Sequence, residues 1–297
     1  MINSRFKFML VSLGLLLAVL LVQALVTREP ACEGRKLGVW LQEYDHGDSK
    51  AADSAVQQMG ADALPELKHM LRAHDSAFKK KLMQLAQKQS VIKFQFANTG
   101  TIRERAVRAC AALGPAARPA IPELGEAVGH GSGSAIRVLE KFGPEAISAL
   151  ATALTNAPGC SPPYSTALAL GRMGANARLA VTNLVWEFEH YSVGYPRWAS
   201  AVSAARISRD LIARKNEPYA PEVLYVKAAL LRGLSGTNVN APAHAAEALG
   251  ELGTYVQEAT PSLLGLLNHP TQRVRECATN ALKSIAPEQL VLATTHR

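Results

Sequence analysis

The chain is divided by six short marks, each an apolar residue followed by Gly or Ala at the end of a helix-like segment. The marks are separated by 54, 29, 31, 79 and 33 residues, and they are Met59-Gly60, Leu113-Gly114, Phe142-Gly143, Met173-Gly174, Leu252-Gly253 and Ile285-Ala286. Three intervals lie near 31, and the longest equals about two such periods plus an insertion. A period in this range is typical of stacked supersecondary units. We therefore expect an all-α fold, an α-α solenoid built from helix pairs.

The residues after the glycine marks support this interpretation. Glycine can adopt the left-handed conformation that ends a helix without a Cβ clash. Proline is favoured at the first position of the next helix, where its missing N–H would have had no partner. Pro122 and Pro261 each follow their glycine by eight residues, and Pro65 follows Gly60 by five. The turn between two helices is thus repeated at separate places in the chain.

One six-residue motif recurs almost letter for letter, at 169–174 (Ala-Leu-Gly-Arg-Met-Gly) and 248–253 (Ala-Leu-Gly-Glu-Leu-Gly). Its inner glycines, Gly171 and Gly250, each cost their helix about 1 kcal/mol relative to alanine. Their recurrence at one repeat position predicts a close helix–helix contact that leaves no room for a side chain.

The amino terminus contains a 19-residue stretch without a charge, Phe8 to Val26, preceded by Arg5 and Lys7. At ~1.5 Å per residue this stretch is just long enough to cross a bilayer core of about 30 Å. An uncleaved transmembrane anchor is favoured over a cleaved signal peptide, whose apolar centre is shorter. The positive charges would stay cytoplasmic. Both alternatives place the repeats outside the cytoplasm, on the periplasmic or extracellular side, and the protein is secreted if the segment is cut.

Behind this segment, Leu37, Trp40, Leu41 and Tyr44 recur on one helical face. The simpler role for this face is a cap over the open end of the array; a partner-binding aromatic pair is the alternative. We expect an anchor or signal segment at 1–27, a linker and capping helix at 28–50, the repeat domain at 51–290, and a C-terminal tail at 291–297.

The glycine marks and the Ala-Leu-Gly-x-Leu-Gly signature resemble the HEAT-repeat family, in particular its short bacterial variety. The resemblance covers residues 51 to about 287, and it implies a superhelix of helix pairs. An anchor, a Gly-x-x-Leu-x-x-Trp-Leu helix and then such repeats look like an arrangement found in exported bacterial HEAT proteins of unassigned role. The sequence departs from the pattern at a basic insertion, 76–101, and at an irregular helix pair, 191–241.

The net charge of +8 comes from one segment, since Lys68 to Arg108 holds ten basic and two acidic residues and the rest of the chain balances. Such a segment is either a solvated helix face or a site for an acidic partner or anionic lipid. The candidate binding residues are Lys79, Lys80, Lys81, Lys88, Lys93, Arg103, Arg105 and Arg108.

No catalytic, cofactor or metal motif is found in the sequence. There is no GxSxG, HExxH, P-loop or GxGxxG pattern, the four cysteines lack metal spacing, and the histidines are isolated. We therefore expect no enzymatic activity, no cofactor and no metal site.

Three functions remain open. The first is a binding scaffold that presents a continuous curved surface to a protein or peptide. The second is an enzyme, since the resemblance includes HEAT-like phycobilin lyases and alkylpurine DNA glycosylases; an exported location argues against both. The third is an electrostatic tether to anionic lipid or envelope polymer through 68–108. The anchor likewise argues against a nucleic-acid partner, because it places the basic residues away from DNA. The scaffold is the favoured interpretation.

Overall fold

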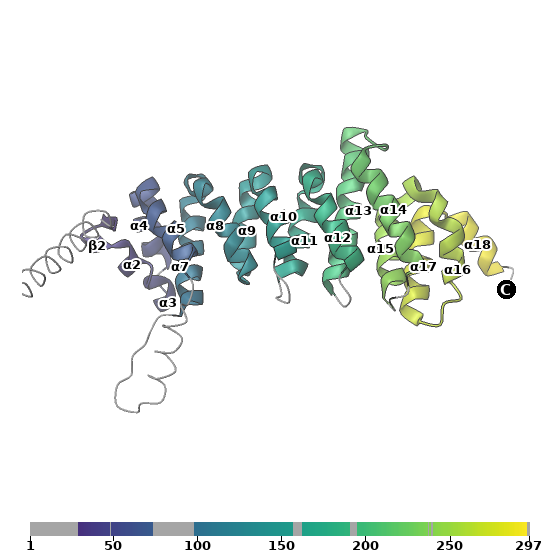
Figure 1. Ribbon diagram of the computed structural model, residues 1–297, viewed down its shortest axis with the longest axis horizontal. Helices are drawn as coiled ribbons and strands as arrows, with labels where there is room; N and C mark the ends of the chain where they lie inside the picture. Colours follow the sequence, from purple (N-terminus) through teal and green to yellow (C-terminus); the bar gives the residue numbers. More distant parts are fainter. Residues whose placement is uncertain are drawn as a thin grey trace, which may run out of the picture.

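The computed structural model describes residues 29–47, 49–73, 98–156, 162–190, 195–236, 238 and 240–295. These residues form an elongated row of helices that runs from α4 near one end to α18 at the other (Figure 1). The predicted anchor at 1–27 lies outside the described residues. In the ranges that are described, no helix combines the length and the apolar character needed to cross a membrane.

A small cap covers the amino-terminal end of the row. It consists of an antiparallel ribbon, β1 (Ala31–Cys32) and β2 (Arg35–Lys36), and two short helices, α2 (Leu37–Trp40) and α3 (Glu43–His46). The single helical face expected here is divided between α2 and α3, but Trp40 and Tyr44 are each only 7% exposed. The Trp40 indole donates to the carbonyl of Cys32 at 3.0 Å, and the Tyr44 hydroxyl donates to Asp53 at 2.7 Å. Both rings therefore pack inward, as a capping role predicts.

Behind the cap, one plan repeats: a first helix, a short 3₁₀ turn and a second helix. The units are α4 (Ser49–Met59), η1 (Gly60–Ala63) and α5 (Leu64–Leu71); α7 (Thr99–Leu113), η2 (Gly114–Ala120) and α8 (Ile121–Gly129); α9 (Gly133–Phe142), η3 (Gly143–Ala146) and α10 (Ile147–Asn156); α11 (Pro162–Arg172), η4 (Gly174–Ala180) and α12 (Val181–His190). After a longer pair, α15 (Ala241–Leu252), η5 (Gly253–Ala259) and α16 (Thr260–Leu266) return to the plan, and α17 (Gln272–Ile285) and α18 (Pro287–Thr295) follow. The predicted all-α solenoid is confirmed.

The glycine marks have positive φ, as predicted, but they are not in the left-handed helical region. Gly114, Gly143 and Gly253 have φ of 57°, 71° and 60° with ψ of −131°, −141° and −138°, whereas the left-handed helix has ψ near +47°. Side chains exclude this conformation, so glycine is required. This glycine conformation leads the chain directly into the 3₁₀ turn. Ala286 has φ −149°, and alanine is tolerated there.

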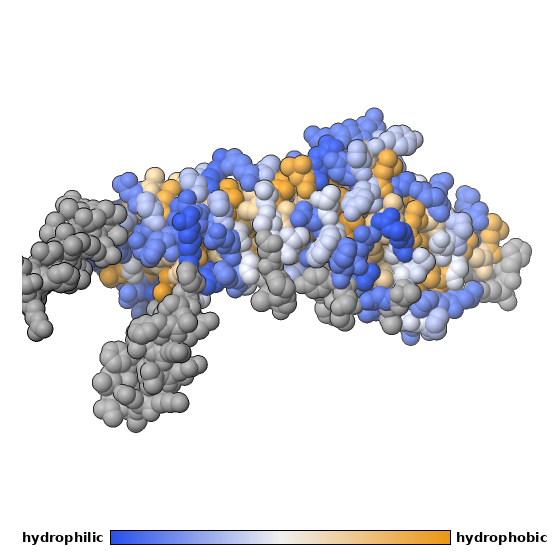
Figure 2. Space-filling model, in the orientation of Figure 1, coloured by the Kyte–Doolittle hydropathy of each residue, from blue (hydrophilic) through white to orange (hydrophobic). Residues whose placement is uncertain are grey.

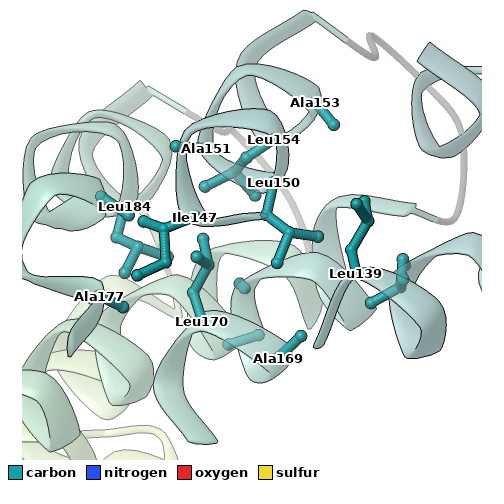
Figure 3. Packing of buried hydrophobic residues seen from close by; sticks show 14 of the residues in the cluster. Leu139, Ile147, Leu150, Ala151, Ala153, Leu154, Ala169, Leu170, Ala177 and Leu184 are labelled. Atoms are coloured by element: carbon teal, nitrogen blue, oxygen red, sulfur yellow. The ribbon is translucent and has the colours of Figure 1, made fainter. Parts of the chain in front are cut away.

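Each unit packs chiefly on its neighbours in the row, so the core extends along the whole array as one continuous layer. Figure 3 shows this layer where two units meet: Leu139 comes from α9, Leu150 from α10, Leu170 from α11 and Leu184 from α12. All four are fully buried. This arrangement is the expected consequence of helix pairs that can bury their apolar faces only against adjacent pairs.

The inner glycines make the close contacts that the repeated motif predicts. A Cβ on Gly171 would lie 2.6 Å from Oγ and 3.0 Å from Cα of Ser203 on the next first helix. A Cβ on Gly250 would lie 3.2 Å from Cα of Ala281. These first helices approach each other backbone to backbone, and the prediction is confirmed at both positions.

The pair predicted as irregular consists of two regular helices, α13 (Tyr195–Lys215) and α14 (Pro221–Leu234). Their turn lacks glycine because Asn216 takes its role, with φ of 53°. The Asn216 N–H donates to the carbonyl of Ile212 at 3.1 Å, which closes the left-handed helix end. Figure 1 shows that this pair projects beyond the edge formed by the other turns. Asparagine tolerates positive φ, and a search for glycine alone does not find this turn.

Two helix boundaries differ from those expected. The repeat expected to resume after the insertion at 76–101 begins earlier, at Thr99, because Asn98 caps the helix and accepts from the N–H of Gly100 at 3.0 Å. The predicted tail is helical as far as Thr295, since α18 packs Leu290 and Ala293 against the core. Most of the predicted insertion, 76–101, lies outside the described residues.

Candidate interaction surface

The eight residues predicted to bind a partner fall into two groups. The five lysines, Lys79, Lys80, Lys81, Lys88 and Lys93, lie outside the described residues. The three arginines lie on α7 and are described. Arg103 donates to the carbonyl of Ala73 at 3.1 Å, at the point where the first unit ends.

The other two arginines connect α7 to the cap. Arg105 donates to the carboxylate of Asp45, and this guanidinium holds the pKa of Asp45 below its usual range. Arg108 donates to the carbonyl of Tyr44 at 3.2 Å and lies over the Tyr44 ring, 6.0 Å from its centre. Both guanidinium groups are therefore used inside the chain, where they fix the cap to the second unit.

A cleft of about 360 Å³ adjoins these arginines, and Asp45, Glu104, Arg105 and Arg108 are among its lining residues. Its two carboxylates balance its two guanidinium groups, so it carries no net charge from these residues. Glu104 also accepts from Ser134 at 2.6 Å. The cleft thus resembles a satisfied polar joint more than a site prepared for an anion.

A second surface becomes visible when the second helices are aligned. The sixth residue of α5, α8, α10, α12 and α16, and the fifth of α14, is exposed in every unit. We call this set of aligned, exposed residues the exposed column. Its members, in order along the array, are His69, Glu126, Thr152, Trp186, Tyr225 and Gly265.

The exposed column changes character at α12. Its first three members are polar, whereas Trp186 and Tyr225 are aromatic and are 46% and 40% exposed. Trp186 is stacked on His190 with ring centres 4.7 Å apart, and Nδ1 of His190 lies 2.9 Å from the carbonyl of Trp186. Leu224, next to Tyr225, is 47% exposed. Large apolar side chains at this exposure are uncommon enough to indicate a contact surface when they are grouped.

Several charged groups near these aromatic residues are paired between helices. Arg232 of α14 lies 2.6 Å from Glu189 of α12, and Lys227 of α14 lies 2.6 Å from Glu258 of η5. Arg178 of η4 forms ion pairs with Glu217, in the turn before α14, and with Glu222, in the first turn of α14. The result is an aromatic surface whose surroundings are close to neutral. Figure 2 shows apolar patches among hydrophilic ones along one face of the array.

Two titratable side chains lie beneath the surface. Glu187 is 1% exposed, its Oε2 has no hydrogen-bond partner among the described residues, and burial raises its pKa to about 7. His244 is 3% exposed, and burial together with the positive charges of Arg273 and Arg197 lowers its pKa to about 4. Neither group is accessible to a substrate in solution. The described residues hold no group of three or more His, Cys, Asp or Glu that could bind a metal ion.

Trp186 and Tyr225 were not among the residues selected from the sequence, because net charge and the glycine marks drew attention elsewhere. The signal was present in the repeat itself. Once the second helices are aligned, two aromatic residues occupy a position that is polar in the earlier units. That alignment requires helix starts accurate to one residue, which the structure supplies.

Comparisons with known proteins agree with this architecture. A family model described as HEAT repeat matches residues 259–289, which cover α16 and α17. A search of curated proteins finds no match. A crystal structure of an engineered protein is similar over 88% of this chain and 81% of that chain, with 16% identity and a TM-score of 0.30, too low to bear on the fold. The family match supports the resemblance seen in the sequence: residues 259–289 are similar to a HEAT repeat, and the plan of helix pairs to which they belong recurs along the described residues.

Proposed function

We propose that this protein is a non-catalytic scaffold that holds a protein or peptide partner on its exposed column, with the main contact at Trp186 and Tyr225. The observation that carries the proposal is this aromatic pair, at one repeat position on two successive second helices. Stacked helical repeats of the HEAT type create extended surfaces that bind other proteins. Trp and Tyr are also the side chains that most often dominate the energy of protein interfaces.

The packing beneath the pair supports this role. Gly171 brings α11 and α13, the first helices of the two units that contain α12 and α14, into backbone contact. The ion pair between Glu189 and Arg232 joins α12 to α14. A surface whose side chains are already held in place loses less conformational entropy when a partner binds.

The proposal includes the membrane anchor at 8–26 and repeats on the periplasmic or extracellular side. The uncharged 19-residue stretch behind Arg5 and Lys7 supports it. Mass measurement of the mature amino terminus tests cleavage, with an intact terminus expected. Protease added to cells whose outer envelope has been opened and whose cytoplasmic membrane is intact should degrade the repeats if they lie outside the cytoplasm. Full protection of the repeats would contradict the placement.

The basic segment is a second contact region in this proposal. Lys79, Lys80, Lys81, Lys88 and Lys93 would attract an acidic group of the partner. Arg103, Arg105 and Arg108 would add to the positive field, while Arg105 and Arg108 also hold the cap. Such attraction between exposed charges weakens as salt rises. Charge reversal at 79–81 should therefore reduce capture at low salt and matter little at 1 M NaCl.

The main test is affinity capture with the full chain in detergent extracts of its own cells. The double variant Trp186→Ala/Tyr225→Ala should lose the captured partner, because a large part of interface energy resides in a few aromatic residues. The matched control is Tyr255→Ala, which removes a 48% exposed tyrosine of η5 that is not a member of the exposed column. The control should capture as well as the wild type.

Equal capture by the double variant and the wild type would refute a contact on the exposed column. The midpoints of thermal unfolding of all three proteins, measured by circular dichroism, must agree within about 2 °C for the comparison of capture to be valid. Agreement is expected, because substitutions of exposed side chains usually change stability by less than about 0.5 kcal/mol.

A further inference from the structure

Two glutamates are fully buried in the part of the chain that the structure describes, and their surroundings differ. Glu123 of α8 is 1% exposed and forms ion pairs with Lys68, at 3.2 Å, and with Arg72. Glu187 of α12 is equally buried, but its Oε2 accepts no hydrogen bond from any described residue. The same position is apolar in the other second helices. Glu187 is therefore a titratable group at a place where the repeat supplies only apolar packing.

The charged groups around α12 do not balance a charge on Glu187. The helix packs against η4, α10, α13 and α14, and α10 contains no charged residue. The charged or titratable side chains around the helix, on the other three elements and on α12 itself, are Arg178, Arg197, Glu222, Lys227, Arg232, Glu189 and His190. Each of them interacts with a group other than Glu187. Burial alone raises the pKa of Glu187 to about 7, so none of these charges stabilises its carboxylate.

The position of Glu187 in α12 shows which part of the array would respond to its ionisation. It lies near the end of the helix at His190, beside Phe188, which is 2% exposed. Phe188 Cζ would lie 2.6 Å from a Cβ on Gly233, so its ring packs closely on the α14 backbone. Trp186 directly precedes Glu187, and its ring is stacked on that of His190. The last turn of α12 thus carries both an anchor to α14 and one half of the exposed aromatic pair.

Ionisation changes the balance between the packed and the open state of this turn. A carboxylate without a counter-ion is costly in an apolar layer and is stabilised once it reaches water. We propose that Glu187 is a pH-sensitive switch: its protonated form keeps the last turn of α12 packed on α14, and its carboxylate releases that turn together with Trp186. The inference rests on the proposed function and names the regulation of its site, since partner binding should weaken as pH rises.

The test measures amide hydrogen exchange of the full chain in detergent at pH 5.5 and pH 8, with each rate divided by the intrinsic rate at that pH. Protection at 185–190 should be at least about tenfold lower at pH 8. The reason is that the carboxyl group titrates near pH 7 in the packed helix and near pH 4.5 when it is open to water. Protection of α10, which has no charged residue, should change less than about twofold, because sections of an array can open locally.

The variants assign the response to one side chain. Glu187→Gln keeps the shape of the side chain and has no proton to release in this range, so α12 should be equally protected at both pH values. Glu187→Leu serves the same purpose if the glutamine variant does not fold. Glu126→Gln makes the matched change at an exposed position of α8 and should respond to pH as the wild type does.

Three results would overturn the switch. One is equal protection of α12 at both pH values in the wild type. Another is a pH response that persists in Glu187→Gln, which would assign it to another group such as His190. The third is an equal change in α10, which would show that the array unfolds as a whole.

Partner capture from detergent extracts at the same two pH values tests the link to function. Capture by the wild type should be weaker at pH 8 than at pH 5.5, and capture by Glu187→Gln should be equal at both. Capture that depends on Trp186 and Tyr225 but not on pH would overturn the regulation and leave the scaffold standing. If α12 responds as expected and capture does not depend on these aromatic residues, the switch stands and the exposed column is wrong as the contact site.

Discussion

Two of the contacts between neighbouring first helices, which we call joints, use the same repeat position in opposite ways. The position lies three residues before the glycine mark that ends each first helix. At the joint between α9 and α11 it holds Glu140, whose carboxylate accepts hydrogen bonds from both Nε and Nη2 of Arg172, at 2.6 and 2.9 Å. At the joint between α11 and α13 it holds Gly171, and the backbone of Ser203 fills the space of the missing side chain.

One earlier joint resembles the first of these, and one later joint resembles the second. Gln57 of α4 donates to the carbonyl of Ala112 at 3.2 Å, so a side chain again connects neighbouring first helices. Gly250 lies against Ala281, in backbone contact. At this one repeat position, α4 and α9 therefore contact the next first helix through a polar side chain, and α11 and α15 do so through backbone packing.

The exposed column changes along the same direction. It is polar at His69, Glu126 and Thr152 and aromatic at Trp186 and Tyr225. The aromatic pair thus lies on the second helices of the two units whose first helices meet at Gly171. The repeat fixes where a side chain is placed, and the individual residue decides whether that place stabilises the array or contacts a partner.

The largest expected effect is at the close joint. Gly171→Leu forces a side chain into space held by Ser203, and overpacking of this kind costs about 1–3 kcal/mol, occasionally more. Glu140→Leu, at the same repeat position, should cost less than about 1 kcal/mol because its side chain is partly exposed. Urea unfolding of both variants measures the difference. Similar losses in the two variants would show that the joints do not differ.

The next effect concerns Glu187, which occupies a position that holds Met70, Ala127, Ala153, Val226 and Leu266 in the other second helices. Its pKa is about 7 in the folded chain and 4.5 in the unfolded chain. Between pH 4.5 and pH 7 the carboxyl group of Glu187 keeps its proton in the folded state and releases it in the unfolded state. Stability contributed by this group therefore falls as pH rises from 4.5 to 7, and the loss is complete above pH 7.

Glu187→Leu should remove that loss. At pH 8 the free energy of unfolding of the variant should exceed that of the wild type by about 1–3 kcal/mol, since an unsatisfied buried polar group costs this much. The gain should be much smaller at pH 4.5. Urea midpoints at both pH values measure the gain. Thr152→Leu, on the exposed column, is the control, and its effect should be the same at both pH values because it removes no titratable group. A gain that is the same at both pH values would mean that Glu187 does not titrate in this window.

The smallest effect is the ion pair of the polar joint. A double-mutant cycle with Glu140→Ala and Arg172→Ala should give a coupling energy of about 0.2–1 kcal/mol, as is usual for exposed pairs. The coupling should decrease at 1 M NaCl. A salt-independent coupling above about 2 kcal/mol would place this joint among the rigid ones and would remove the contrast between the two regions.

Much of the architecture could be predicted because its signals are local. The glycine marks, the prolines that follow them and the apolar period each depend on residues within one helix pair. The two inner glycines were correctly assigned to close contacts for the same reason, since a repeated glycine inside a helix is costly unless something occupies its space. The precise ψ of the glycine marks and the asparagine turn at Asn216 required coordinates.

The sequence alone determined the repeating unit, the order of the units and the small-residue contact between first helices, because backbone preferences and burial periods act over a few residues. Only the tertiary structure decided which charges are already used. Arg105 is paired with Asp45, 60 residues away, and Trp186 shares a surface with Tyr225 from the next unit. Such pairings depend on the register between helices that are distant in the chain, and that register is fixed by packing of the whole array.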